Sequence, residues 1–334
     1  MKGGGGVLGR FNTANASLNT ASGIWNLNEA HALSQAGTWV RSGVCIEVLM
    51  IGGGGGAGTR HTGGGGAGGL LYYGTNSVPK TPNGGTFLFL GGAYTVTVGA
   101  GGTGVPSGTA APSAATSGSN TCLIGPGIVP LDAYGGGTSY TPGGSGGGSY
   151  ANNICTGFGC GISGQGYRGG WSHTLSASGE ADYAGGGGGG AGGVGGNSVY
   201  GTGGAGGPGL CYSNFDTFGT DGSNSASPPS GKGRFASGGG GGVGATGNYS
   251  PLSAGGGGRG GGNSSQPGES GIANTGGGGG AGGFQSSPNS CGGTGGSGIV
   301  ILRYAGPQCA TGGTVTTSNG FTTHAFTSSG SFVL

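Results

Sequence analysis

The chain has 334 residues, of which 102 are Gly and 14 are Pro, while only 5% are charged and the formal net charge is +2. Without a strict triplet period, this composition is typical of disordered chains, but such chains rarely carry as many aromatic residues as the 12 Tyr, 11 Phe and 3 Trp found here. We therefore expect the chain to collapse or assemble, and its scattered Lys and Arg exclude a nucleic-acid partner, which requires clustered positive charge.

Residues 1–44 have an ordinary composition and are interpreted as an N-terminal leader or attachment segment. Within this segment, Asn26–Ala36 places Leu27, Ala30 and Leu33 at helical spacing, with an Asn as N-cap and a Gly directly after it. The pattern predicts one short helix, which we expect to be the best helix of the chain.

The N-terminus lacks the apolar core of a Sec signal peptide, because Met1-Lys2 is followed by Gly3–Gly6. No apolar run approaches the ~20 residues that a membrane span needs. An extracellular location would then require another exit route, of which lysis of the cell by a virus is the simplest.

Residues 45–305 are predicted to form a glycine-rich body in which short strands alternate with runs of Gly. The strand candidates are rich in β-branched and aromatic residues and are bounded by Gly or Pro. They are Cys45–Ile51, Thr86–Leu90, Tyr94–Val98 and Gly298–Tyr304.

The Gly runs of this body are similar in length, which indicates elements stacked in register. A polyglycine-II helix rises about 3.1 Å per residue and has no internal hydrogen bonds. Without Cβ atoms, several such helices can lie side by side and satisfy their N–H and C=O groups laterally. Flexible linkers are the alternative. The runs are Gly52–Gly56, Gly63–Gly66, Gly185–Gly190, Gly238–Gly242, Gly255–Gly258 and Gly276–Gly280.

Residues 306–334 form a strand-like tail, in which two halves rich in Thr, Phe and Val meet at Ser318-Asn319-Gly320. Asn-Gly readily adopts positive φ and favours a tight hairpin. We thus expect a mainly β protein of short strands and a polyglycine-II bundle, with very little α-helix.

We expect no catalytic residue, cofactor or metal site in this chain. No C-x-x-C motif occurs, and the four His lie far apart in the sequence. Gly231-Lys232-Gly233 lacks the Ser or Thr of a phosphate-binding loop, and Glu180 and Asp182 are the only close acidic pair. The sequence therefore indicates a non-enzymatic protein.

The cysteines allow two interpretations. Cys155 and Cys160 can close a small disulfide loop in an oxidising medium, or the thiols can be buried and free. The total of seven leaves one Cys unpaired within the chain.

Three blocks of the body resemble the opening, middle and closing parts of the glycine-rich proteins of tailed bacteriophages. They are Ile46–Gly56, Tyr94–Gly102 and Gly295–Tyr304. The resemblance implies a virion tail fibre or a tail-tip adhesin with polyglycine-II packing, and it implies no catalytic residue. In that family, a strand like Phe326–Leu334 commonly opens the domain, whereas here it closes the chain.

This displaced strand suggests how copies of the chain could join. Unpaired edge strands bind further strands, so donation of the tail to the opening strand of the next copy would give an open, head-to-tail filament. Cys45 and Cys309 lie near the two ends of this contact and are candidates for a cross-link. The donor residues are Phe321, Phe326, Phe332 and Leu334, and the acceptor residues are Ile46, Val48 and Met50.

Several alternatives stay open. The tail can instead fold back on its own body, or Gly37–Val40 can already fill the opening-strand position. In function, the first expectation is an extracellular or virion filament subunit whose partners are copies of itself. The others are a tail-tip adhesin that contacts a host cell surface, and an ice- or surface-binding polyglycine protein.

Overall fold

The structure is a computed structural model, and its described residues are mainly β, as predicted. Their helical content is one short 3-10 turn, η4 (Ser213–Phe215). The expected leader helix lies outside the described residues. These are 43–75, 87–108, 115–151, 157–173, 183–220, 233–244, 248–262, 266–284 and 290–334.

The largest sheet has six antiparallel strands, five of them in the order β10-β11-β9-β1-β2, while β3 pairs with the start of β1. The central strands β1 and β9 are the apolar segments predicted at the two ends of the body. The bounds are β1 (Val44–Ile51), β2 (Leu70–Tyr73), β3 (Leu88–Leu90), β9 (Ile299–Ala305), β10 (Thr314–Ser318) and β11 (Phe321–Phe326).

A second sheet of four antiparallel strands has the order β12-β4-β5-β6. Side chains from both sheets form one hydrophobic core that includes Val48, Leu302, Val96 and Leu123. A short pair, β7–β8, forms a separate two-stranded sheet, and its Phe235 packs with Leu49 and Ile301 in a second hydrophobic core. The bounds are β4 (Ala93–Thr97), β5 (Thr121–Ile124), β6 (Leu131–Ala133), β7 (Leu210–Cys211), β8 (Arg234–Phe235) and β12 (Gly330–Val333).

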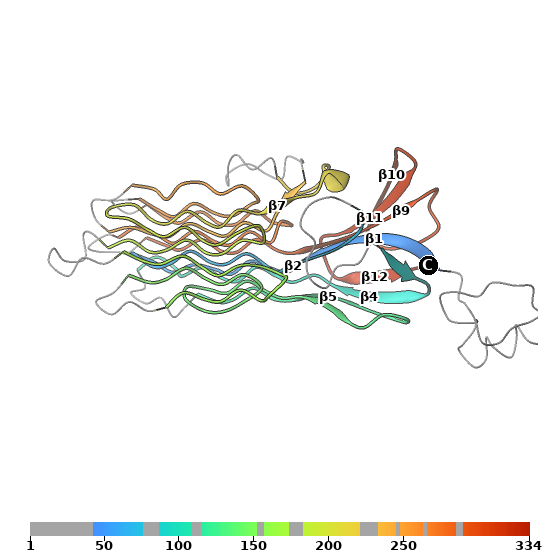
Figure 1. The fold of residues 1–334 in the computed structure, drawn as a ribbon, viewed down its shortest axis with the longest axis horizontal. Helices are drawn as coiled ribbons and strands as arrows, with labels where there is room; N and C mark the ends of the chain where they lie inside the picture. Colours follow the sequence, from blue (N-terminus) through green and yellow to red (C-terminus); the bar gives the residue numbers. More distant parts are fainter. Residues whose placement is uncertain are drawn as a thin grey trace, which may run out of the picture.

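The strands continue into extended glycine segments that lie side by side and form the other half of an elongated molecule (Figure 1). Successive N–H groups of residues 52–57 donate in turn to residues 66–69, 116–119 and 293–296, and the cycle repeats after three residues. Three residues per turn is the period of a polyglycine-II helix. The bonds are Gly52→Gly69, Gly53→Ser119, Gly54→Gly296, Gly55→Gly66, Gly56→Thr116 and Ala57→Gly293.

The segment 63–69 shows how densely these helices pack. Gly64, Gly65 and Gly66 each donate to one neighbouring segment and accept from another, so that the helix is bonded on all sides. A Cβ on any of these residues would overlap a neighbouring backbone carbonyl. The expected polyglycine-II packing is thus present, and the linker alternative is wrong for these runs. The neighbouring residues are Gly186 and Gly148 for Gly64, Gly279 and Gly239 for Gly65, and Gly137 and Gly55 for Gly66.

Candidate assembly site

The C-terminal tail forms three strands that bridge the two sheets. β10 and β11 make a hairpin on β9, and β12 pairs with β4. Asn319 (φ 52°) and Gly320 (φ 77°) both have positive φ, as a type I′ turn requires. The predicted hairpin at this position is confirmed.

Three of the four proposed donor side chains lie in or against the core that also contains the proposed acceptors. Phe326 and Phe332 are buried there, and Leu334 packs against its margin. Ile46, Val48 and Met50 belong to the same core, all fully buried. The structure therefore brings donor and acceptor side chains together.

Phe321, the fourth proposed donor, lies outside this core. Its ring is only partly buried and is covered by the guanidinium of Arg303, 3.7 Å from the ring centroid. This cation–π contact holds the start of β11 against β9.

The backbone partners of the tail differ from those of the acceptor strand. β1 is flanked by β9 on one side and by β2 and β3 on the other, whereas the tail bonds to β9 and β4. Within a single chain, the tail is folded back on its own body, which is one of the alternatives that the sequence left open.

A buried polar network that sequence reasoning missed fastens the tail. His324 Nδ1 lies 2.7 Å from the carbonyl oxygen of Gly312, so this nitrogen carries the proton. Its Nε2 lies 3.0 Å from the Tyr304 hydroxyl, which also accepts N–H bonds from Cys309 and Ala310. Burial raises the pKa of Tyr304, which keeps the phenol protonated as the donor to His324.

A second buried network joins the sheet to η4. The carboxylate of Glu47 accepts from Arg303 at 2.7 Å, from the Tyr72 hydroxyl at 2.5 Å and from the Asn214 amide at 2.8 Å. A buried carboxylate is tolerated because these donors replace its water. Since Arg303 also covers Phe321, the network reaches from the body to the tail.

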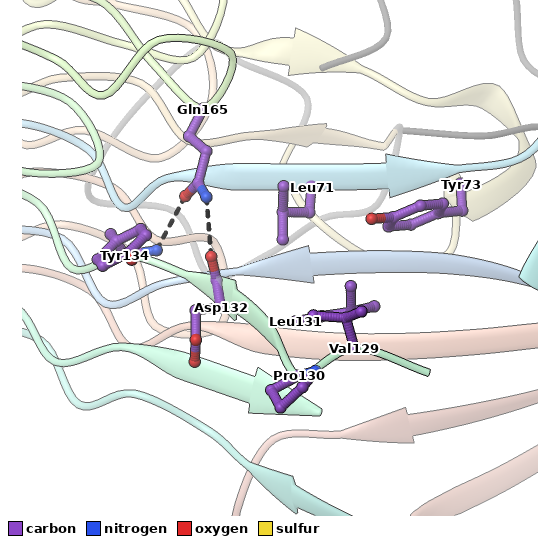
Figure 2. A pocket seen from close by; sticks show the side chains of 8 residues that line it. All are labelled: Leu71, Tyr73, Val129, Pro130, Leu131, Asp132, Tyr134 and Gln165. Atoms are coloured by element: carbon purple, nitrogen blue, oxygen red, sulfur yellow. Dashed lines mark hydrogen bonds between the residues drawn. The ribbon is translucent and has the colours of Figure 1, made fainter. Parts of the chain in front are cut away.

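A surface pocket of about 310 Å³ lies between the edge strands β2 and β6 (Figure 2). Gln165, at one end of it, donates to the carbonyl of Asp132 and accepts from the Tyr134 N–H, at 2.8 and 2.9 Å. The backbone carbonyl oxygen of Gln165 accepts a hydrogen bond from the Leu70 N–H at 3.0 Å. One residue therefore bonds to the outer edges of both sheets, at Leu70 and at Asp132.

The described cysteines form no disulfide. Cys45, Cys160 and Cys309 are exposed thiols, and Cys155 lies outside the described residues. Cys122 is different, because burial and the neighbouring carboxylate of Asp132 raise its pKa to about 12. Such a thiol stays protonated and unreactive at neutral pH.

Among the residues that the structure describes, no cluster of three or more His, Cys, Asp or Glu is arranged to hold a metal ion. The described part of the chain also contains no helix of the length and apolarity that a membrane crossing needs.

The sequence matches the family of the glycine-rich domain over residues 32–305. No curated protein matches it significantly. The match ends at the last residue of β9, so the three strands of the tail lie beyond the family's region.

Proposed function

The chain belongs to the glycine-rich domain family, and from this premise we propose that it is a non-enzymatic structural subunit of an extracellular or virion fibre. The observation that carries the proposal is the polyglycine-II bundle. Its segments are neutral, bonded laterally in three directions and interlocked without side chains. Such a bundle resists bending, because motion of one helix breaks bonds to several neighbours. A stiff, elongated body is suited to a fibre.

The tail supplies a means of joining bodies head to tail. It lies beyond the family's region, and its strands would keep the same partners if they were exchanged between two copies. The connection from β9 to β10, residues 306–313, contains Gly306, Gly312 and Gly313, all with positive φ. Opening this connection would extend the tail toward a neighbour, and repeated exchange without rotational closure gives a filament.

The virion assignment rests on the three sequence blocks that resemble phage glycine-rich proteins. Family membership by itself supports the glycine-rich body, and the fibre role is our inference from that body and its tail. The partners that follow from it are copies of this chain, in an extracellular or virion location.

Cross-linking tests the exchange directly. Thr95 on β4 and Ser331 on β12 are opposite each other and exposed. In a background where all seven native Cys are Ser, the pair Thr95→Cys and Ser331→Cys should form a disulfide. Exchange predicts a ladder of covalent multimers on a non-reducing gel, together with filaments in negative-stain micrographs.

The controls are the two single Cys variants, which can form at most covalent dimers. If the double variant migrates as a cross-linked monomer while filaments are visible, the fibre role stands without strand exchange. If the protein is monomeric at all concentrations and no filament forms, the fibre proposal fails.

A second candidate function is a tail-tip adhesin that contacts a host cell surface. It is favoured by exposed side chains on adjoining segments of the bundle, among them Trp171, Val199, Tyr200 and Tyr249. The Ser198 N–H donates to the Trp171 carbonyl at 2.9 Å, and Thr202 pairs with Asn248. Exposed aromatic groups of this kind are typical of interaction surfaces. Binding of labelled protein to host cells, lost in Trp171→Ala together with Tyr200→Ala, would support this candidate.

A further inference from the structure

The edge of β10 differs from the outer edges of β2, β6 and β12. The outer edges of β2 and β6 are bonded to Gln165, at Leu70 and at Asp132. The outer edge of β12 pairs with Thr311 at Val333. β10 is the last strand on its side of the six-stranded sheet, and no described strand pairs with its outer edge.

The hairpin geometry fixes which backbone groups this edge presents. In a hairpin with a two-residue type I′ loop, the residues that flank the loop, Ser318 and Phe321, form a hydrogen-bonded pair. Successive residues of a strand direct their backbone N–H and C=O groups to opposite sides. The N–H and C=O groups of Val315 and Thr317 therefore point outward. Neither residue has a backbone partner on that side among the described residues.

The sequence of β10 lacks the usual protection of an edge strand. Natural edge strands carry Lys, Pro or a bulge that prevents further pairing. β10 reads Thr-Val-Thr-Thr-Ser, without charge or Pro, and four of its five residues are exposed. It is therefore a neutral strand with high β-propensity whose outward hydrogen-bonding groups have no described backbone partner.

We infer that the outer edge of β10 is a contact between two copies of this chain, in which β10 pairs with β10 of its partner in antiparallel fashion about a twofold axis. This inference rests on the proposed self-assembly and adds a lateral contact to the head-to-tail one. A second copy is the occupant that the edge fits, because the strand is complementary to itself. Centred on Thr316, the pairing places Val315 opposite Thr317 of the partner, and their outward groups form four inter-chain hydrogen bonds.

The same register makes the side-chain contacts compatible. Thr316 lies opposite its own copy, and Thr314 lies opposite Ser318 of the partner. Hydroxyl pairs of this kind stabilise antiparallel strands, and the hairpin already contains one, Thr317 with Thr322, at an Oγ1–Oγ1 distance of 3.2 Å. No like charges meet. The two six-stranded sheets would become one continuous sheet across the twofold axis.

Charge complementation at the twofold position tests this register. Thr316→Lys places two ammonium groups directly opposite each other across the axis, and Thr316→Glu does the same with carboxylates. We expect each variant alone to shift toward monomer in sedimentation velocity at low ionic strength, by about fivefold in dissociation constant. An equimolar mixture of the two should restore the wild-type dimer. Thr97→Lys on β4, at an exposed threonine of the other sheet, is the matched control and should sediment as the wild type does.

A second variant removes the hydrogen bonds themselves. Thr317→Pro deletes an outward N–H and the hydroxyl contact with Thr322 but leaves the backbone bonds between β10 and β11 in place, because Pro is tolerated where an edge N–H faces outward. We expect a loss of lateral association greater than tenfold with an unchanged circular dichroism spectrum. If Thr317→Pro unfolds the hairpin, the Lys and Glu variants decide the matter alone.

The outcomes separate this inference from the fibre proposal. Filaments that persist at full width in Thr316→Lys would overturn the β10 contact and leave the fibre proposal standing. Wild-type dimers that respond to the Lys and Glu variants but form no filament would support the β10 contact and count against the fibre. Wild-type protein that sediments as a monomer at every concentration would overturn the contact.

Discussion

His324 Nε2 lies 3.0 Å from the hydroxyl of Tyr304, and this contact ties the C-terminal hairpin to the last strand of the glycine-rich body. Both side chains are buried. The hydroxyl is also the acceptor for two N–H groups of the connection that leads into the tail, at Cys309 and Ala310. A single phenol oxygen therefore organises the start of the tail and its second strand.

Removal of that hydroxyl should weaken the tail. Tyr304→Phe leaves His324 Nε2 and the two N–H groups without their partner, and a buried unsatisfied polar group costs about 1–3 kcal/mol. We expect a loss of unfolding free energy in this range by urea denaturation. Tyr167→Phe, at an exposed tyrosine, is the control. Equal midpoints for the two variants would contradict the role given to Tyr304.

Any side chain introduced into the polyglycine core should destabilise the protein. A Cβ at Gly187 would overlap the carbonyl oxygen of Ala205, whereas a Cβ at Gly157 would meet no atom within 4 Å. We expect Gly187→Ala to lower the unfolding free energy by about 3 kcal/mol or to prevent folding, because backbone cannot move aside as a side chain can. Gly157→Ala should stay within about 0.5 kcal/mol of the wild type. Similar thermal midpoints for both variants would argue against a close-packed bundle.

The two ion pairs of the described residues should differ in their contribution to stability. Arg303→Met leaves the Glu47 carboxylate buried without its cation, for which we expect a loss of about 3–5 kcal/mol. Arg259 and Glu269 are each about one third exposed, at 33% and 28%, so Arg259→Met should cost less than about 1 kcal/mol. The comparison is made by denaturant unfolding of the two variants in parallel. If Arg259→Met lowered the unfolding free energy more than Arg303→Met, the buried network around Glu47 would not be the polar contact that stabilises the sheet most.

His61 should make the protein less stable in acid. Burial, and then the nearby charge of Arg60, lower its pKa to about 3. Below about pH 6.5, His61 is therefore protonated in the unfolded chain but stays neutral in the folded chain. As a result, the unfolding free energy falls as the pH drops from 6.5 toward 3, by up to about 1.4 kcal/mol per pH unit. His61→Phe, which keeps a ring stacked on Tyr150, should have a flatter profile over this window. Parallel profiles for the variant and the wild type would show that His61 is not the titrating group.

The sequence by itself determined the elements whose character is local. The apolar runs predicted β1 and β9, the Asn319-Gly320 pair predicted the hairpin, and the recurring Gly runs predicted polyglycine-II helices. Each follows from residues that are neighbours in the chain. β-branched side chains favour extended backbone, Asn-Gly favours positive φ, and only Gly permits backbones to touch.

Only the tertiary structure decided which segments become neighbours. β2, β5 and β6 were not predicted, because each has four residues or fewer and merges with a glycine segment. The roles of Gln165 and Glu47 were equally hidden, since their partners lie far away in the sequence, up to 256 residues for Glu47 and Arg303. The tail pairs with β9 and β4 because their edges and the core beneath them are contiguous in space. Lateral bonds of polyglycine are alike for every Gly, so the sequence permits many arrangements of the helices, and the side chains of the two sheets select one.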